Sequence, residues 1–231
     1  MRDYARFDKY LDRLLQDVYA QPPDEGHTAW ATQAVTTLGS IVQNCNTVLD
    51  IGCGQGFMKP IFEKMGYEWT GVTVGEDFAM CQSLKIENVH NADMTFLPFE
   101  DNSFDLVFSR HVLEHSPFPA ITLMEWRRVC KGWLILIAPT PNFWTIRGKN
   151  HYSVLPKENL IWLLERSGWG VLHENEFTSR DPLFLRYWEV YQNTLDEDGK
   201  ETPSTETAFE QIPNQVVEYR LLLEQMEPVL E

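Results

Sequence analysis

Three glycines at alternating positions follow an aspartate in the segment VLDIGCGQG, residues 48–56. Glycine lets a backbone turn sharply and approach a bound molecule closely, because no β-carbon stands in the way. Asp50 lies two residues before the first of the glycines Gly52, Gly54 and Gly56, where its carboxylate can hold the amides of the turn or the ammonium group of a ligand. The segment therefore predicts a ligand-binding loop at the end of a strand.

The spacing of the glycines separates the nucleotide-binding loops that it could form. A dinucleotide loop needs a third glycine at the sixth position, which is Phe57 here, and no Gly-Lys-Ser/Thr follows as a phosphate loop requires. What remains, Asp-x-Gly-x-Gly-x-Gly, resembles motif I of the class I S-adenosylmethionine (SAM) dependent methyltransferases. The resemblance implies a Rossmann-like α/β fold with a seven-stranded, mostly parallel sheet, an antiparallel seventh strand and helices on both faces. It also implies a set of cofactor-binding residues here, namely Asp50, Gly52, Cys53, Gly54 and Gly56.

The second expected strand departs from this family. Most class I methyltransferases carry an Asp or Glu at its end that binds both ribose hydroxyls, whereas this chain has Thr73, followed by Val74. A hydroxyl is a weaker acceptor than a carboxylate. Gly-Val-Thr resembles the cyclopropane fatty acid synthase branch, in which the loop after this strand contacts the ribose, so we expect Thr73 and Val74 to contact the cofactor. Either Glu76 or Asp77 could supply the missing carboxylate.

The ends of the next two strands carry further matching positions. Asp93 matches the residue that accepts a hydrogen bond from the adenine amino group in the family, and Met94 would lie beside the ring. The stretch LPFEDNSFDLVFSRHVLEH closely resembles the type 11 subgroup, whose members act largely on small molecules. This stretch contains a strand that ends near Ser109 and Arg110, and we expect both residues to contact the cofactor. His111 follows them. It is either a candidate general base that faces the methyl group or a residue with a positioning role.

His111, Glu114 and His115 also form an HxxEH pattern, which in inverted zinc peptidases binds a metal. Some relatives that methylate catechol-type rings carry ExxEH here and use a divalent metal, but His111 replaces their first Glu. We therefore expect no metal, and we expect His115 to be a structural residue.

The loop after the fifth strand concentrates aromatic and basic side chains in an otherwise acidic chain. It is either one wall of a pocket for an anionic or aromatic acceptor or a solvated loop covering the edge of the core. Its residues are Phe143, Trp144, Arg147, Lys149, His151 and Tyr152. Ser109-Arg110-His111-Val112 does not match the Asn/Asp-Pro-Pro-aromatic tetrad of nucleic-acid adenine methyltransferases.

The elements that must position these residues alternate along the chain. Apolar runs and turn residues predict strands near 48–51, 67–74, 86–90, 104–108, 133–142, 170–177 and 184–192, the last one antiparallel. Helical spacing predicts helices over 3–19, 28–43, 57–65, 119–131 and 214–226, and one more in the second part of the segment 142–169, around Leu160 and Leu164. We divide the chain into an N-terminal helical cap (1–27), a SAM-binding domain (28–194) and an acidic linker with a C-terminal helix (195–231).

Composition limits the function classes. The net charge is −15 with a pI near 4.8, which disfavours binding to nucleic acid and to anionic membranes. The N-terminus lacks an apolar signal-peptide core, and no apolar run is long enough to span a membrane. Four cysteines without CxxC spacing indicate reduced thiols, so we expect a cytoplasmic protein.

These patterns predict methyl transfer from SAM to a small-molecule acceptor. They do not indicate an oligomeric state. Two alternatives remain. One is a regulatory or scaffold protein of the same fold that binds SAM and docks through its acidic tail. The other is an NAD-type oxidoreductase, which Phe57 at the sixth loop position disfavours.

Overall fold

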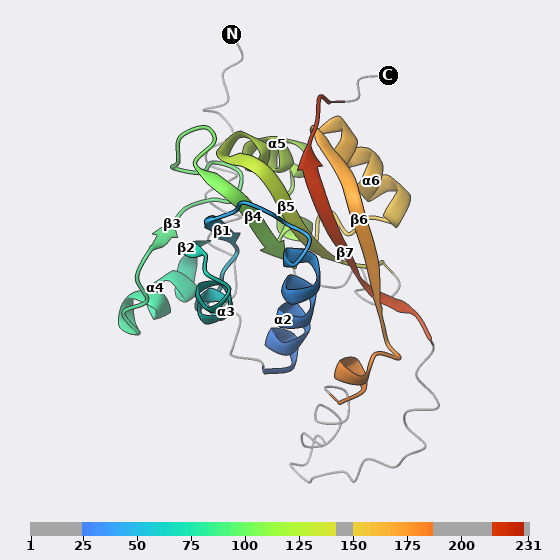
Figure 1. Cartoon of the computed structure of the whole chain (residues 1–231), viewed down its shortest axis with the longest axis horizontal. Helices are drawn as coiled ribbons and strands as arrows, with labels where there is room; N and C mark the ends of the chain where they lie inside the picture. Colours follow the sequence, from blue (N-terminus) through green and yellow to red (C-terminus); the bar gives the residue numbers. More distant parts are fainter. Residues whose placement is uncertain (1–24, 142–149, 187–213, 229–231) are drawn as a thin grey trace.

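A computed structural model describes residues 25–141, 150–186 and 214–228 (Figure 1). In these parts of the chain seven strands form one sheet in the order β3-β2-β1-β4-β5-β7-β6. The strands are β1 Thr47–Ile51, β2 Glu68–Thr73, β3 Val89–Asn91, β4 Phe104–Arg110, β5 Cys130–Pro139, β6 Trp169–Thr178 and β7 Val216–Gln225. The strands β1 to β5 are parallel, and β7 pairs antiparallel with both β5 and β6.

Helices cover both faces of this sheet. They are α2 Glu25–Gly39, α3 Lys59–Lys64, α4 Gly75–Ser83, the 3₁₀ helix η2 Leu113–His115, α5 Pro119–Val129 and α6 Lys157–Arg166. Proline stands in the first turn of α3 and α5, where its missing N–H costs no hydrogen bond. A sheet covered on both faces explains why the strands are apolar runs rather than alternating patterns.

Adjacent residues of β1 illustrate the two cores. Val48 joins the cluster with Leu38 of α2 and Phe62 of α3, whereas Leu49 joins the cluster with Trp126 of α5 and Leu164 of α6. Successive side chains of a strand point to opposite faces, so both residues are fully buried. The core on each face thus fixes β1, and with it the start of the glycine loop.

The predicted fold class is confirmed, with two corrections near the C-terminus. Residues 214–226, predicted as a helix, contain the strand β7, and residues 184–186, the described start of the predicted seventh strand, are helical. The prediction for β7 was wrong because the charged residues Glu218 and Arg220 interrupt the apolar run and made it look amphipathic. Both side chains are buried in the structure, where they pair with each other.

Other predictions agree in part or lie outside the described residues. The second helix begins at Glu25 and ends at Gly39 rather than covering 28–43. The first helix (3–19) and the acidic segment 195–208 lie outside the described residues, and the three-part division of the chain stays a prediction. Within the described ranges, every helix is too short or too polar to cross a membrane.

Candidate active site

The glycine loop begins where β1 ends. Gly52, Gly54 and Gly56 have φ angles of 73°, 53° and 77°, in the left-handed region that side chains disfavour. A β-carbon on Gly52 would lie 2.1 Å from Cγ2 of Val112. The amides of Gly52 and Cys53 donate to the carbonyl oxygen of Val72, at 2.8 and 3.0 Å, which ties the loop to β2. The loop conformation therefore requires glycine at its first position.

Asp50 lies beneath this loop and is 2% exposed. Its Oδ2 accepts a hydrogen bond of 3.0 Å from the indole Nε1 of Trp69. Burial raises the pKa of Asp50 to about 7, and the hydrogen bond from Trp69 opposes that shift. The Gly52 and Cys53 amides, which the sequence interpretation offered as partners for Asp50, bind Val72 instead.

The end of β2 distinguishes the two candidate carboxylates. Thr73 is the last residue of β2, and α4 begins two residues later. Glu76 is exposed, whereas Asp77 is buried and its Oδ1 accepts a hydrogen bond of 3.2 Å from Gln55 of the glycine loop. The other Asp77 oxygen lies 3.9 Å from where a β-carbon on Gly54 would stand. Asp77 therefore faces the loop, and Glu76 does not share its burial.

Asp93 and Met94 follow β3 and are half-buried. Oδ1 of Asp93 accepts a hydrogen bond from the Thr95 amide at 2.8 Å, which closes a turn. The carbonyl oxygen of Met94 accepts from the indole of Trp126 in α5 at 3.0 Å. These bonds fix the backbone of the segment while Asp93 remains half-exposed.

The end of β4 is tied to β7. Ser109 is fully buried, and Nη2 of Arg110 donates to Oε1 of Glu218 at 2.8 Å. His111 has a φ of 52°, which is unusual for a residue other than glycine, and its Nε2 lies 3.0 Å from the same Glu218 oxygen. Burial lowers the pKa of His111 to about 4, so the ring is neutral at pH 7.

Glu218 also pairs with Arg220, at 3.1 and 3.0 Å from its Nε and Nη2. Arg220 continues to α2, where its Nη1 donates to Oε1 of Gln33 at 2.7 Å. The neighbouring positive charges keep the pKa of Glu218 well below its usual value. Sequence reasoning missed this network; the available signal was a pair of opposite charges two residues apart in an apolar run.

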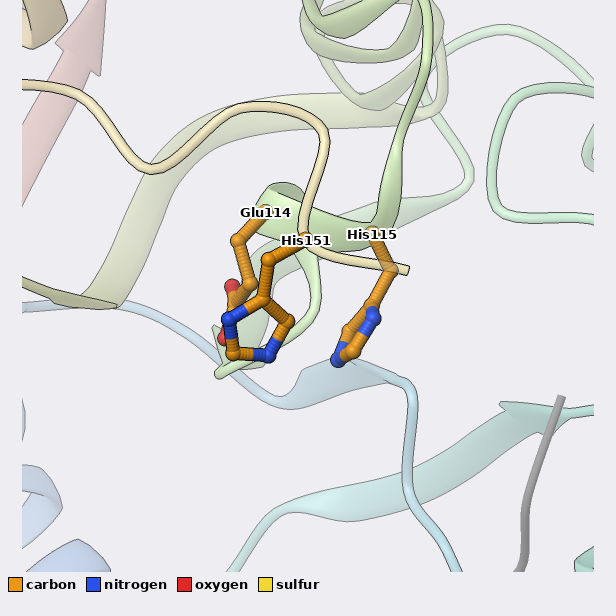
Figure 2. A group of neighbouring side chains, drawn as sticks. All are labelled: Glu114, His115 and His151. Atoms are coloured by element: carbon orange, nitrogen blue, oxygen red, sulfur yellow. The ribbon is translucent and has the colours of Figure 1, made fainter. Parts of the chain in front are cut away.

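A second group of side chains meets beside η2 (Figure 2). Glu114 and His115 come from η2, and His151 comes from the segment after β5; their possible ligand atoms lie within 4.8 Å of one another. Burial raises the pKa of Glu114 to about 8 and lowers that of His115 to about 4. His111, the first residue of the HxxEH pattern, contacts Glu218 instead.

The structure brings the predicted cofactor residues to one edge of the sheet. Strands β3, β2, β1 and β4 are consecutive neighbours, so the segments that follow them adjoin at their carboxyl ends. In open α/β sheets this edge is where ligands bind. The structure describes His151 and Tyr152 of the aromatic and basic loop that follows β5. The other residues of that loop, Phe143, Trp144, Arg147 and Lys149, lie outside the described residues.

Comparison with known proteins agrees with this geometry. Residues 49–136, from β1 into β5, match a family described as a methyltransferase domain. Residues 49–136 therefore have the sequence pattern of a methyltransferase domain. The matched region contains the glycine loop and Asp77, Asp93 and His111, so the methyltransferase domain includes every predicted cofactor position. The chain also resembles an uncharacterized methyltransferase of Mycobacterium sp. (strain JLS), 36% identical over 141 residues, covering 60% of this chain and 51% of that protein.

A ubiquinone biosynthesis O-methyltransferase of Maricaulis maris is 26% identical over 160 residues, covering 59% of this chain and 63% of that protein. The chain spans about half the length of the first curated relatives that it matches.

Among solved structures, the chain resembles a SAM-dependent methyltransferase from Archaeoglobus fulgidus, with a TM-score of 0.61 and 19% identity, covering 86% of this chain and 94% of that one.

The [4+2]-cyclase SpnF gives a TM-score of 0.63 at 18% identity, covering 96% of this chain and 93% of that one. At these identities the likeness concerns the fold. Because one of these neighbours is named as a cyclase, the reaction must be argued from the site.

Proposed function

We propose that this chain transfers a methyl group from SAM to a small-molecule acceptor. The observation that carries the proposal is the glycine turn with left-handed φ angles at the end of β1, with buried Asp77 on one side and the ends of β3 and β4 beside it. The family match over residues 49–136 supports the same conclusion.

The residues present suit the cofactor. Gly52, Gly54 and Gly56 leave backbone without β-carbons, which suits close approach by the methionine end, together with Cys53. Asp77 would accept from the ribose hydroxyls in place of the usual strand-end acid. Asp93 would accept from the adenine amino group. Among the other predicted contacts, those beside the nucleoside would be Thr73, Val74 and Met94. The buried residues Asp50 and Ser109 would support the site from beneath. Arg110 would reach the site from β4.

SAM supplies an electrophilic methyl group, so the chain's main task is to hold an acceptor lone pair in line with it. His111 is the proposed catalytic residue because it ends β4 in a strained conformation and is neutral at pH 7. A pKa of about 4 makes it a weak base. It therefore suits an acceptor atom that already carries an available lone pair, which the imidazole would orient.

The acceptor is proposed to be small and either anionic or aromatic. Tyr152 is 48% exposed beside His151 and would form one wall of its pocket. The net charge of −15 opposes a polyanionic substrate such as nucleic acid.

A pair of glycine variants tests the cofactor site. Gly54→Arg would place a long cationic side chain in the loop, and a β-carbon there meets its neighbours at 3.5 Å or more, so the fold should persist. Gly66→Arg is the control, because Gly66 also has a positive φ, 92°, and open space around it. In both variants the arginine backbone must adopt a left-handed conformation, which costs about 1–2 kcal/mol. We expect Gly54→Arg to weaken SAM binding by about 100-fold or more, or about 3 kcal/mol, measured by calorimetry.

Unchanged SAM affinity in Gly54→Arg would contradict the site. Stabilisation by NAD but not by SAM or S-adenosylhomocysteine, in a thermal-shift assay, would indicate an oxidoreductase. Labelled SAM incubated with a metabolite extract tests turnover. Tight SAM binding with no labelled product would favour the regulatory or scaffold alternative.

A further inference from the structure

Two chain segments bring three potential metal ligands together. Glu114 and His115 are consecutive residues of η2, and His151 follows β5 by twelve residues of chain. Figure 2 shows all three side chains extending in the same direction from these two segments. One ligand atom from each lies within 4.8 Å of the other two, and the two imidazole rings are 4.9 Å apart between centroids.

Hydrogen bonds that do not involve the side chains of Glu114, His115 and His151 hold these two segments together. The amides of Tyr152 and Ser153 donate to the carbonyl oxygen of Glu114, at 2.6 and 3.0 Å. The Ser153 hydroxyl donates to the carbonyl oxygens of Leu113 and Ser116, at 3.0 and 2.7 Å. The three ligand side chains are therefore preorganised on a fixed frame, which reduces the entropic cost of binding an ion.

His115 shows the arrangement that metal-ligating histidines commonly have. Its Nδ1 lies 3.1 Å from the carbonyl oxygen of Asn150. A proton on Nδ1, donated to that carbonyl, places the lone pair on Nε2 and fixes the orientation of the ring. This is the tautomer that a metal ion needs at Nε2.

Glu114 gives an independent reason to expect a cation. Its side chain is 3% exposed, and its Oε2 has no hydrogen-bond partner among the described residues. A buried polar atom without a partner destabilises a fold by about 1–3 kcal/mol. A cation bound between this oxygen and the two imidazoles would satisfy it.

We propose that Glu114, His115 and His151 form a binding site for a divalent transition-metal ion such as Zn²⁺. Two imidazoles and one carboxylate suit such ions better than Mg²⁺ or Ca²⁺, which prefer oxygen ligands alone. Ligands bind zinc in a tetrahedral arrangement at about 2.0–2.2 Å, so two ligand atoms lie roughly 3.3–3.6 Å apart. Side-chain rotations must therefore draw the three atoms closer than their present spread.

The site adjoins the proposed active site. Val112 directly precedes η2, and its side chain packs against Gly52 of the glycine loop. Three protein ligands leave a coordination position for water or for an external oxygen. If the proposed function holds, the class of acceptor that this position favours is one bearing a hydroxyl or carboxylate oxygen. Metal binding itself does not depend on that function.

The test uses the full chain after removal of metal with a chelator. We expect one Zn²⁺ per chain by calorimetry, and a Co²⁺ absorption spectrum typical of nitrogen and oxygen ligands. Glu114→Gln and His151→Ala should each weaken Zn²⁺ binding by about 10-fold to 100-fold or more, while His173→Ala, on the exposed surface of β6, should not.

A thermal denaturation series separates lost binding from lost folding. Glu114→Gln should keep the metal-free unfolding temperature, since it replaces a carboxylate that lacks a partner, yet it should lose the stabilisation that Zn²⁺ gives the unaltered chain. Several outcomes would overturn the proposal. They are no saturable one-to-one binding, equal losses in His173→Ala, equal zinc stabilisation in all variants, or a thiolate-to-cobalt absorption band. If zinc binds but Gly54→Arg still binds SAM normally, only the proposed function fails.

Discussion

Asp77 is the residue that we propose accepts from the ribose hydroxyls in place of an acid at Thr73. Thr73 lacks the charge that relatives place at the end of the second strand, and the structure buries Asp77 against Gln55 of the glycine loop. A carboxylate at that distance from the loop can accept two hydroxyl hydrogens at once. Glu76, one residue earlier, is exposed, so the order of residues in the first turn of α4 selects one acid.

We expect Asp77→Asn to weaken SAM binding by roughly 10-fold to 100-fold, because charge-assisted hydrogen bonds contribute about 1.5–3 kcal/mol. Glu76→Gln removes the same charge from the adjacent exposed position and should leave the affinity nearly unchanged. Calorimetric titration of both variants with SAM measures the difference. Equal losses of SAM affinity in the two variants would show that the negative charge of this helical turn, and not the position of Asp77, affects binding.

Asp50 predicts a pH dependence of stability. Its pKa is about 7 in the folded chain and roughly 4 when unfolded, so the folded state holds a proton that the unfolded state has lost between those values. Stability contributed by this proton is present below pH 4 and is lost as pH rises through 7.

In Asp50→Asn that dependence disappears, and the amide oxygen can still accept from Trp69. The free energy of unfolding of the variant, relative to the unaltered chain, should therefore rise by about 3 kcal/mol between pH 5 and pH 8. Urea denaturation at the two pH values measures this change. A constant difference between the two proteins would mean that Asp50 is ionised throughout.

At the scale of elements, the main tie is the ionic network that joins β4, β7 and α2. Glu218 of β7 pairs with Arg110 of β4 and with Arg220, and Arg220 reaches Gln33 of α2. Arg220 also lies over the ring of Phe177 in β6, 3.9 Å from its centroid. The network places His111 at the carboxyl end of β4, so the antiparallel strand also positions the proposed catalytic residue.

Removing the charge of Glu218 leaves the buried Arg220 and the partly buried Arg110 without their counter-ion. We expect Glu218→Gln to lower the free energy of unfolding by about 3–5 kcal/mol, measured by urea denaturation. Glu224→Gln on the exposed part of the same strand should change it by less than about 0.5 kcal/mol. A loss below 1 kcal/mol in Glu218→Gln would show that water reaches the network.

At the scale of the whole molecule, the sheet order puts the functional segments side by side. Because β1 lies between β2 and β4, three strands that are far apart in sequence end at one edge. The same edge receives η2 and the segment of His151, which come before and after β5. The proposed cofactor contacts and the proposed metal ligands therefore occupy neighbouring parts of one edge of the sheet, although the chain supplies them over about a hundred residues.

The sequence by itself determined the fold class, the glycine loop and the strand-end positions near Asp93 and His111. These are local features: a buried strand is an apolar run, and a turn with left-handed φ angles needs glycine at fixed spacing. Only the tertiary structure decided three other matters. It converted residues 216–225 from an expected helix into a strand, because the partners of Glu218 and Arg220 lie up to 187 residues away. It chose Asp77 over Glu76 by burial. It also joined His151 to Glu114, a contact between segments that no local pattern encodes.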